Sequence, residues 1–250
     1  LLSLGVLLLD YICRQRTAQG TMPRNPVAVM SIVSTPMAAR VAEHWGVEMR
    51  RVLTGFKYIG DVMNQLMSAG EPERFLMGFE ESCGYLKGTY ARDKDAVVAS
   101  MLVCEMAAYY KEKGLSLLDV LNGLYREHGV YRHSLVNAEF EGAQGMIAMQ
   151  NLMDSLRNNH PAAIAGLKVV KVSDYLLSVK KDLATGREEA IDLPKSNVLA
   201  FALEGNAGLV VRPSGTEPKV KAYVTATGTD AAAAAAMADR LTAAAKELLK

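Results

Sequence analysis

Short apolar runs alternate with longer amphipathic segments through the first half of the chain. The runs are rich in β-branched or bulky apolar residues and predict buried strands at 26–34, 47–53 and 75–79. Around them, the pattern predicts helices at 1–16, 36–46, 60–69, 93–113 and 116–128. This order predicts a parallel sheet with helices on both faces, whose ligand loops follow the carboxyl ends of the strands.

The pattern changes after Gly129, where strands follow one another with few helices between them. Strands are predicted at 134–140, 168–172, 198–203, 209–211 and 220–226, with helices at 143–157 and 230–250. A cluster of strands flanked by helices is typical of an α+β domain with an antiparallel sheet. We therefore predict a three-layer α/β domain with a parallel-type sheet at 1–129, followed by a smaller α+β domain at 130–250.

The composition is that of an ordinary globular protein and excludes several classes of function. Of the 250 residues, 50% are hydrophobic and 22% are charged, and the formal net charge is +1. This balance gives no general attraction for nucleic acid or for an anionic membrane, so any anion must be bound by a local site. The apolar start at 1–9 lacks a basic region and is too short to span a bilayer, which favours a buried helix.

The cysteines and histidines follow no disulfide or metal-binding pattern. Cys13, Cys83 and Cys104 are widely spaced and form no CxxC pair, which favours a reduced, cytoplasmic protein. The four histidines also lack the spacing of metal ligands. We therefore expect no metal site in this chain.

The segment RPSGTEPK at 212–219, called here the arginine loop, lies between two predicted strands and contains the parts of a phosphate clamp. Arg212 offers a planar guanidinium that matches phosphate oxygens, and Ser214 and Thr216 offer hydroxyl donors. Backbone N–H groups around Gly215 could form an anion-binding nest. The alternative is an ordinary turn between strands that happens to contain polar residues, and short motifs of this kind often occur by chance.

The segment GFEESCGYL at 78–86, called here the glutamate loop, follows a predicted buried strand at the sheet edge where ligand loops lie. Glu80 and Ser82 would share a face if the segment is extended, because alternate residues of a strand do. A carboxylate and a hydroxyl together suit the vicinal hydroxyls of a sugar. Two adjacent carboxylates are, however, more often part of a solvated loop.

Two lysines are further candidates for a role at an anionic ligand. Lys57 lies between two glycines in a predicted loop, where it could neutralise a phosphate or simply be an exposed lysine with a buried stem. Lys94 lies at the start of a predicted helix, where a cation is unfavourable, and a crowded lysine could act there as an acid or base. From the residues alone, a helix start capped by Asp93 with mixed surface charge is the better explanation of this segment.

Four segments occur together and in the same order in one protein family: TGFKYI, GFEESCGYL, RDKDA and RPSGTEPK, at 54–59, 78–86, 92–96 and 212–219. On these segments the chain resembles domains three and four of the α-D-phosphohexomutases, most nearly those of the phosphoglucomutase type. The resemblance covers nearly the whole chain. It implies an α/β third domain and a smaller α+β fourth domain.

The resemblance also implies roles for individual residues. Glu80 and Ser82 would hold sugar hydroxyls, and Lys57 would lie near the substrate phosphate. Lys94 matches a lysine that relatives are proposed to use as an acid or base, or as an electrostatic helper. The remaining matched residues would bind the phosphate that is not being transferred: Arg212, Ser214, Gly215 and Thr216.

Two parts of the family pattern do not occur in this sequence: a serine loop of the TASHNP type, which carries the phosphoryl group, and a DGDxDR-type loop that binds Mg²⁺. Because in-line phosphoryl transfer needs such parts, we expect a C-terminal fragment that is inactive alone. The whole enzyme would interconvert glucose 1-phosphate and glucose 6-phosphate through glucose 1,6-bisphosphate, with Mg²⁺ as cofactor. Its partners would be a hexose phosphate and the N-terminal domains one and two of the same enzyme.

Other interpretations of the sequence stay open. The enzyme could instead be a phosphomannomutase or a phosphopentomutase, since epimeric sugars differ by a single hydroxyl. The chain could also be a phosphosugar-binding module without catalysis. An initiator codon just before Leu1 would favour the binding module, whereas an upstream reading frame with the serine and aspartate loops would favour the enzyme.

Overall fold

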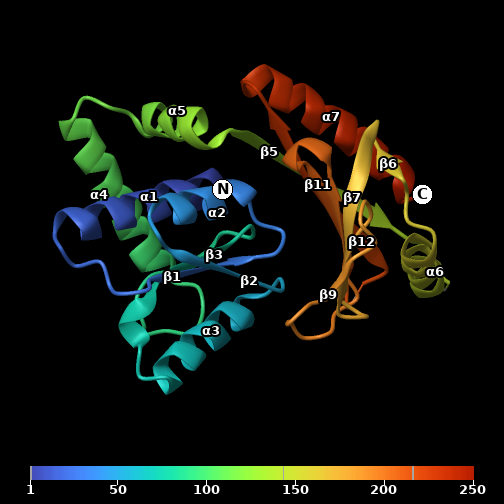
Figure 1. The fold of residues 1–250 in the computed structure, drawn as a ribbon, viewed down its shortest axis with the longest axis horizontal. Helices are drawn as coiled ribbons and strands as arrows, with labels where there is room; N and C mark the ends of the chain where they lie inside the picture. Colours follow the sequence, from blue (N-terminus) through green and yellow to red (C-terminus); the bar gives the residue numbers. More distant parts are fainter. Residues whose placement is uncertain (1, 143, 216) are drawn as a thin grey trace. The chain divides into compact units, whose positions relative to one another are not determined.

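The computed structural model of the chain describes residues 2–142, 144–215 and 217–250. The chain divides into two compact units, Leu1–His128 and Gly129–Lys250 (Figure 1). The last helix of the first unit ends at His128, and Gly129 follows it with φ 92°, a left-handed conformation in which glycine commonly ends a helix. The change of sequence pattern after Gly129 therefore falls at a helix end.

The first unit is built on a mostly parallel sheet in the order β2-β1-β3-β4. Its strands are β1 (Val27–Ser31), β2 (Glu48–Val52), β3 (Phe75–Glu80) and β4 (Gly84–Leu86). β1 pairs in parallel with both β2 and β3, which confirms the predicted parallel sheet. The short β4 runs antiparallel to β3 at the edge, and the hydrophobic pattern gives no sign of it.

Helices cover both faces of this sheet, as predicted. α1 and α2 lie on one face and α3 lies on the other (Figure 1). The helices of the unit are α1 (Leu2–Ala18), α2 (Pro36–His44), α3 (Phe56–Ser68), α4 (Ala96–Glu112) and α5 (Leu117–His128), with a 3₁₀ turn at Pro72–Arg74.

The apolar start of the chain is a buried helix, as the sequence predicts. The buried residues of α1 run from Gly5 to Cys13. Gly5 admits the ring of Phe79 on β3, because a Cβ at position 5 would lie only 2.5 Å from that ring. In the described part of the chain, no helix combines the length and apolar character needed to cross a membrane.

A side-chain cap sets the start of α2, and a glycine turn sets that of α3. Thr35 caps α2 by accepting the backbone N–H of Met37 at 3.3 Å, and Pro36 takes the first helical position, as predicted. α3 begins at Phe56, earlier than the predicted start at 60, because Gly55 turns the chain with φ 119°. Lys57 therefore lies in the first turn of a helix and not in a loop.

The predicted start of α4 at Asp93 is wrong. α4 begins at Ala96, and Asp95 caps it by accepting the backbone N–H groups of Val97 at 2.8 Å and Val98 at 3.0 Å. Asp93 and Lys94 precede the helix. Lys94 is therefore not a cation within the first turn of α4, where the helix dipole would disfavour it.

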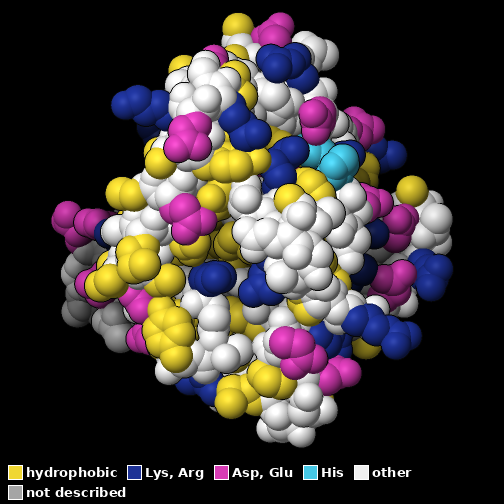
Figure 2. All heavy atoms as spheres, turned by 90° about the vertical axis from the view of Figure 1, so that its left-hand side faces the viewer, with side chains coloured by type: hydrophobic (Ala, Val, Ile, Leu, Met, Phe, Trp, Pro, Cys, Tyr) yellow, Lys and Arg dark blue, Asp and Glu magenta, His cyan; other side chains and the backbone are white. Residues whose placement is uncertain are grey.

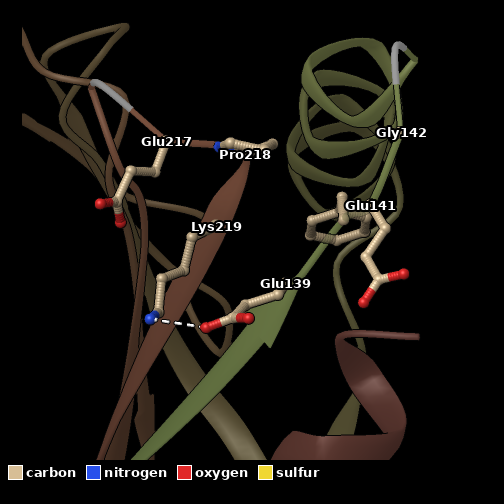
Figure 3. Close-up of a pocket in the computed structure, with 7 residues that line it drawn as sticks. Glu139, Glu141, Gly142, Glu217, Pro218 and Lys219 are labelled. Carbon is tan, nitrogen blue, oxygen red and sulfur yellow. Dashed lines mark hydrogen bonds and ion pairs between the residues drawn. The ribbon is translucent and has the colours of Figure 1, made fainter.

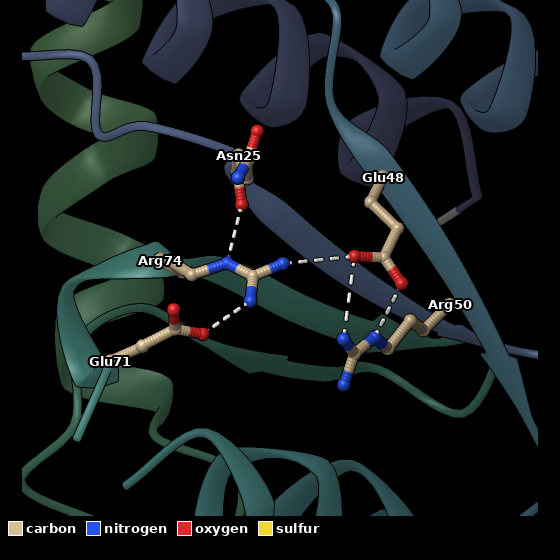
Figure 4. Close-up of polar contacts among 5 residues, drawn as sticks. All are labelled: Asn25, Glu48, Arg50, Glu71 and Arg74. Atoms are coloured by element: carbon tan, nitrogen blue, oxygen red, sulfur yellow. Dashed lines mark hydrogen bonds and ion pairs between the residues drawn. The ribbon is translucent and has the colours of Figure 1, made fainter. Parts of the chain in front are cut away.

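A charged cluster joins the amino-terminal ends of the three parallel strands (Figure 4). Arg74, just before β3, donates to the carbonyl of Asn25 at 2.7 Å, to Glu48 Oε2 at 3.1 Å and to Glu71. Arg50 also binds Glu48, at 2.7 Å. Because Asn25 precedes β1 and Glu48 begins β2, one guanidinium links all three strands at the sheet end opposite to the ligand loops.

Part of the hydrophobic surface of α4 is not covered by the rest of the first unit. Met106 and Tyr110 are buried, whereas Val97 and Met101 are 71% and 64% exposed. Figure 2 views the side of the molecule on which α4 lies in Figure 1, and it shows hydrophobic side chains in patches between charged ones. The helix therefore lacks the polar outer face that is usual for a surface helix.

The second unit is an antiparallel sheet in the order β5-β12-β11-β10-β7-β8-β9, with β6 paired to β7. Its hydrophobic core contains alternate β12 residues such as Val220 and Val224 together with Met153 of α6 and Leu241 of α7. The antiparallel sheet of the predicted α+β domain is confirmed. Among the described residues of this second unit, the sequence pattern missed only the shorter strands β6, β8 and β9. The elements are β5 (Val130–Glu139), α6 (Gly145–Asn158), β6 (Ala163–Ile164), β7 (Leu167–Asp174), β8 (Val179–Asp182), β9 (Glu188–Ala190), β10 (Leu199–Leu203), β11 (Gly208–Pro213), β12 (Lys219–Gly228) and α7 (Ala231–Leu248).

Candidate functional site

The glutamate loop is a tight β-hairpin and not the extended segment considered from the sequence. β3 ends at Glu80 and β4 begins at Gly84, and these two residues face each other in the strand register. Residues 81–83 form the turn, in which Cys83 has φ 60°, the left-handed conformation typical of the last residue of a three-residue hairpin loop. Ser82 therefore lies on an exposed turn, whereas Glu80 lies in the buried sheet.

Glu80 is a buried carboxylate with a cation beside it. The residue is 7% exposed, and Lys94 Nζ lies 4.0 Å from its Oε1. Burial raises the pKa of Glu80 and the charge of Glu81 raises it further, whereas Lys94 and the backbone N–H of Gly55 act in the opposite direction. The net rise of the pKa means that folding disfavours the charged form of Glu80, as is common for carboxylates in ligand sites.

Lys94 is held next to Glu80 by the start of α4. The backbone N–H of Asp95 donates to the carbonyl of Tyr85 on β4 at 2.8 Å, which ties this segment to the hairpin. Lys94 Nζ also lies 3.0 Å from Asp93 Oδ1 and 5.2 Å from the centre of the Phe56 ring. The side chain is 45% exposed, so Lys94 is not a desolvated lysine, but it is one of the predicted residues that the structure brings together.

Lys57 is placed differently from Lys94. Its Nζ lies 5.0 Å from the centre of the Tyr58 ring, and the residue is exposed. Two of its neighbours reach the glutamate loop instead: Gly55 donates its backbone N–H to Glu80, and Phe56 packs under Lys94. The segment 54–59 therefore joins the candidate site mainly through its backbone and an aromatic ring.

Glu81 ties the glutamate loop to the carboxyl end of β1, a role that the sequence analysis does not find. Ser31 Oγ donates to Glu81 Oε2 at 2.7 Å, and the hydroxyl oxygens of Ser31 and Ser34 lie 3.0 Å apart. Both serines are buried, so Glu81 satisfies polar groups that water cannot reach. No signal in the sequence pointed to this contact, because Glu81 lies in the turn after β3 and Ser31 is 50 residues away in the chain.

The acidic residues near this hairpin do not form a metal site. Asp95 caps α4 and accepts the hydroxyl of Tyr90, and Asp93 binds Lys94. Among the residues with described positions, no group of three or more His, Cys, Asp or Glu could hold a metal ion. The Mg²⁺ that the resemblance implies for a whole enzyme therefore does not fit the described residues of this chain.

The arginine loop connects β11 to β12 in the second unit. The backbone N–H of Ser214 donates to the carbonyl of Lys219 at 2.7 Å, and its hydroxyl accepts the N–H of Glu217 at 3.3 Å. Arg212 lies directly opposite Lys221 in the strand register, so two cations share one face of the sheet beside the loop. The sequence analysis does not single out Lys221, although alternation along β12 would have placed it there.

Gly215 and Thr216 are the other two predicted residues of the arginine loop. Gly215 is exposed, and a Cβ added to it would meet open space. Its backbone is therefore accessible to an anion, which is one requirement for a phosphate nest. Thr216 lies outside the described residues.

A hollow of about 500 Å³ lies beside the arginine loop (Figure 3). Lys219 Nζ binds Glu139 Oε1 there at 2.8 Å, and this pair lowers the pKa of Glu139 and raises that of Lys219. Because three carboxylates surround one paired lysine, the hollow is poorly suited to a phosphate, and Arg212 and Lys221 are the better candidates. The lining residues are Glu139, Phe140, Glu141, Gly142, Glu217, Pro218 and Lys219.

Two profiles of one protein family match most of the chain. The profile described as phosphoglucomutase/phosphomannomutase, alpha/beta/alpha domain III, matches residues 3–128. The profile described as phosphoglucomutase/phosphomannomutase, C-terminal domain, matches residues 152–244.

Curated relatives align with most of the chain. A phosphoglucomutase of Staphylococcus haemolyticus is 38% identical over 221 residues, and one of Staphylococcus aureus strain MRSA252 is 37% identical over 221 residues. Each alignment covers 88% of this chain and 39% of the relative, so the chain spans about two-fifths of the length of these relatives.

Solved structures share the fold at low sequence identity. The phosphoglucomutase pp63/parafusin from Paramecium, in its open form, has a TM-score of 0.62 at 18% identity, and the match covers 96% of this chain and 41% of the Paramecium protein. A protein from Thermus thermophilus described as a phosphomannomutase has a TM-score of 0.59 at 18% identity, with 97% and 40% covered. These structures show that the fold is shared. The two profiles show that the chain belongs to the phosphoglucomutase/phosphomannomutase family.

Proposed function

We propose that the chain provides domains three and four of a phosphoglucomutase, in which the first unit binds sugar hydroxyls and the second binds a phosphate. One observation carries the proposal: the matched segments include a buried carboxylate paired with a lysine and a loop flanked by two cations. The name of the staphylococcal relatives favours glucose phosphates as the substrate class.

In the first unit, Glu80 is the proposed acceptor for sugar hydroxyls and Ser82 the proposed donor. A buried carboxylate suits this task, because its two oxygens can accept more hydrogen bonds than the one from Gly55, and burial limits the competition from water. Lys94 keeps a positive charge beside Glu80 and is the candidate acid, base or electrostatic helper. Lys57, exposed at the start of α3, is the candidate contact for a substrate phosphate.

In the second unit, the proposed phosphate ligands are the residues of the arginine loop. Arg212 supplies a guanidinium fork, and Lys221 on the neighbouring strand adds a second cation. Ser214 and the backbone around Gly215 supply neutral donors. Thr216 remains a proposed ligand on the strength of the motif alone.

The whole enzyme would need parts that this sequence does not carry. The phosphorylated serine and the Mg²⁺ ligands would come from N-terminal domains one and two of the same enzyme, and Mg²⁺ would stabilise the charge of the transferred phosphoryl group. The reaction would interconvert glucose 1-phosphate and glucose 6-phosphate through glucose 1,6-bisphosphate, in the cytoplasm. The 250-residue chain alone would bind a hexose phosphate without converting it.

Binding to the 250-residue chain tests the sugar assignment. NMR titrations with glucose 1-phosphate, mannose 1-phosphate, ribose 5-phosphate and inorganic phosphate would rank the four ligands. Glu80→Ala should reduce the preference among the sugars more than the affinity for inorganic phosphate. An unchanged preference in this variant would overturn the assignment of Glu80 to the sugar.

Kinetics of the whole enzyme test the catalytic part of the proposal. The full-length protein should convert glucose 1-phosphate, and Arg212→Ala in it should raise KM and lower kcat. The isolated chain should show no turnover. A full-length protein without mutase activity, but with intact sugar phosphate binding, would favour the alternative of a non-catalytic phosphosugar-binding module.

A further inference from the structure

Gly84 faces Glu80 across the hairpin of the glutamate loop. The two residues are direct partners in the antiparallel register, and side chains at such positions stand next to each other on one face of the sheet. A Cβ at position 84 would lie 2.7 Å from Cγ and 2.9 Å from Oε1 of Glu80. It would also lie 2.9 Å from Cδ of Lys94. These separations are well inside the optimum of about 3.5–4.0 Å for carbon atoms in contact.

The space above Gly84 is used by the two side chains that form the ion pair. Glu80 leans across the hairpin into this space and is thereby buried, and Lys94 reaches the same space from the segment before α4. Their charged atoms meet at 4.0 Å. The missing side chain at position 84 is therefore what allows carboxylate and ammonium to share one small surface.

Backbone conformation does not explain why a glycine stands at this position. Gly55 and Gly88 have φ 119° and 90°, in the region that other residues avoid, but Gly84 is not among the glycines with positive φ. An L-residue could adopt the strand conformation at position 84 without strain. The requirement is for space, and the atoms that fill the space belong to the proposed sugar-binding carboxylate and its lysine.

We propose that Gly84 is a positioning residue that sets the orientation of the Glu80 carboxylate and thereby determines which sugar hydroxyls the site accepts. The inference rests on the proposed function of Glu80. Gly84 itself touches no ligand in this account and acts through Glu80 and Lys94. A methyl group at position 84 would push both side chains out of their shared surface, while the hairpin backbone stays in place.

The test compares Gly84→Ala with the wild-type chain in NMR titrations with glucose 1-phosphate and inorganic phosphate. We expect glucose 1-phosphate to bind about tenfold more weakly, because overpacking forces side chains out of their preferred positions. Inorganic phosphate should bind as in the wild type. Gly123→Ala on α5 is the matched control, since the nearest atom to its Cβ is the tip of Arg126 at 3.8 Å, and it should bind both ligands like the wild type.

The double variant Glu80→Ala, Gly84→Ala shows whether the effect of Gly84→Ala passes through Glu80. It also provides a second test if the Gly84→Ala variant folds poorly. Glu80→Ala removes the atoms of Glu80 that a new Cβ would meet and leaves only Cδ of Lys94, which belongs to a half-exposed side chain that can move aside. Gly84→Ala should therefore cause little further loss of glucose 1-phosphate affinity in that background. A carboxyl titration followed by ¹³C NMR gives an independent readout. In Gly84→Ala the pKa of Glu80 should fall towards the ordinary carboxyl value, because the side chain is displaced towards water.

The outcomes separate this inference from the proposed function. The wild-type chain should prefer glucose 1-phosphate to inorganic phosphate. If the Gly84→Ala variant shows the same preference as the wild type, only the role of Gly84 is overturned. A further tenfold loss in the Glu80→Ala background, or an unchanged Glu80 titration, also overturns that role. A wild-type chain without any preference overturns the sugar site itself and this inference with it.

Discussion

The glutamate loop and the arginine loop are built on opposite physical principles. The glutamate loop holds its carboxylate in the sheet, 7% exposed, with a lysine at 4.0 Å and a neighbouring carboxylate tied to buried serines. The arginine loop is closed mainly by hydrogen bonds of its own residues and leaves Gly215 exposed. The strand residues of the glutamate loop are buried in their unit and only its turn is exposed, whereas the arginine loop connects two strands at the end of its sheet.

This difference in burial decides in which loop binding and stability are coupled. A buried carboxylate can distinguish sugar hydroxyls, because it has few alternatives to the correct partner, but its surroundings must be fixed by packing. An exposed cationic loop attracts any phosphate and needs little support. Substitutions in the glutamate loop should therefore change stability as well as binding, whereas those in the arginine loop should change binding alone.

The largest effect is expected from Arg212→Ala in the arginine loop. Loss of a charge-assisted hydrogen bond costs about 1.5–3 kcal/mol, so the affinity of the chain for inorganic phosphate should fall roughly 10- to 100-fold. The melting temperature should stay within about 1 °C of the wild-type value, since Arg212 is not in the core of the second unit. Arg240→Ala in the same unit is the control and should bind phosphate normally. A destabilised Arg212→Ala variant would contradict the statement that substitutions in the arginine loop change binding alone.

Glu81→Ala should show the opposite behaviour in the glutamate loop. It leaves the buried hydroxyl of Ser31 without its acceptor, which costs about 1–3 kcal/mol. Hydrogen exchange should therefore speed up in β1 and β3 of the first unit and stay unchanged in β11 and β12. Glu81→Gln keeps an acceptor oxygen and should lose much less stability. Equal exchange rates in Glu81→Ala and the wild type would mean that Glu81 is not a tie.

The pH dependence of stability should also differ between the two loops. Because the pKa of Glu80 is raised in the folded state, the folded first unit binds a proton more readily than the unfolded chain. Its contribution to stability is present below the unfolded carboxyl pKa and is lost as the pH rises through the folded-state pKa. Glu80→Gln should remove this loss and gain less than about 1 kcal/mol at pH 7, while it weakens sugar binding. Parallel pH profiles of the two proteins would contradict this account.

The smallest effect is expected from Lys57→Ala. Lys57 is exposed at the start of α3, where a cation is slightly unfavourable and its contact with the Tyr58 ring slightly favourable. Stability should change by less than about 0.5 kcal/mol, and the affinity for glucose 1-phosphate should fall by only about two- to fivefold. Chemical denaturation and NMR titration would measure the two changes. A tenfold loss of affinity would place Lys57 at the centre of the phosphate contacts.

The fold could be predicted from the sequence because its elements follow strong patterns. The apolar runs of β1 and β3, the Thr35–Pro36 helix start and the glycine at 129 each have one favoured local structure. β4 could not be found, because three residues are too short to show alternation. The start of α4 was misplaced, because Asp93 and Asp95 are equally good caps and only the bond from Asp95 to Tyr85 decides between them.

The candidate site was only partly visible in the sequence. The motif pointed to Glu80 and Lys94, but their pairing depends on the turn at 81–83 and on the bare α-carbon of Gly84. The role of Glu81 depends on a contact with Ser31, 50 residues away in the chain, and that of Lys221 on the register in which β12 pairs with β11. Such partners are fixed by tertiary packing, which residue spacing does not encode.

We propose that the first unit distinguishes the sugar and that the second binds the phosphate. An NMR titration of the 250-residue chain with glucose 1-phosphate, repeated with inorganic phosphate, tests it most directly. We predict that glucose 1-phosphate shifts backbone amide signals in both 78–86 and 212–219, and that inorganic phosphate shifts those in 212–219 alone. Glucose 1-phosphate that shifts signals in 212–219 but leaves 78–86 untouched would contradict the claim.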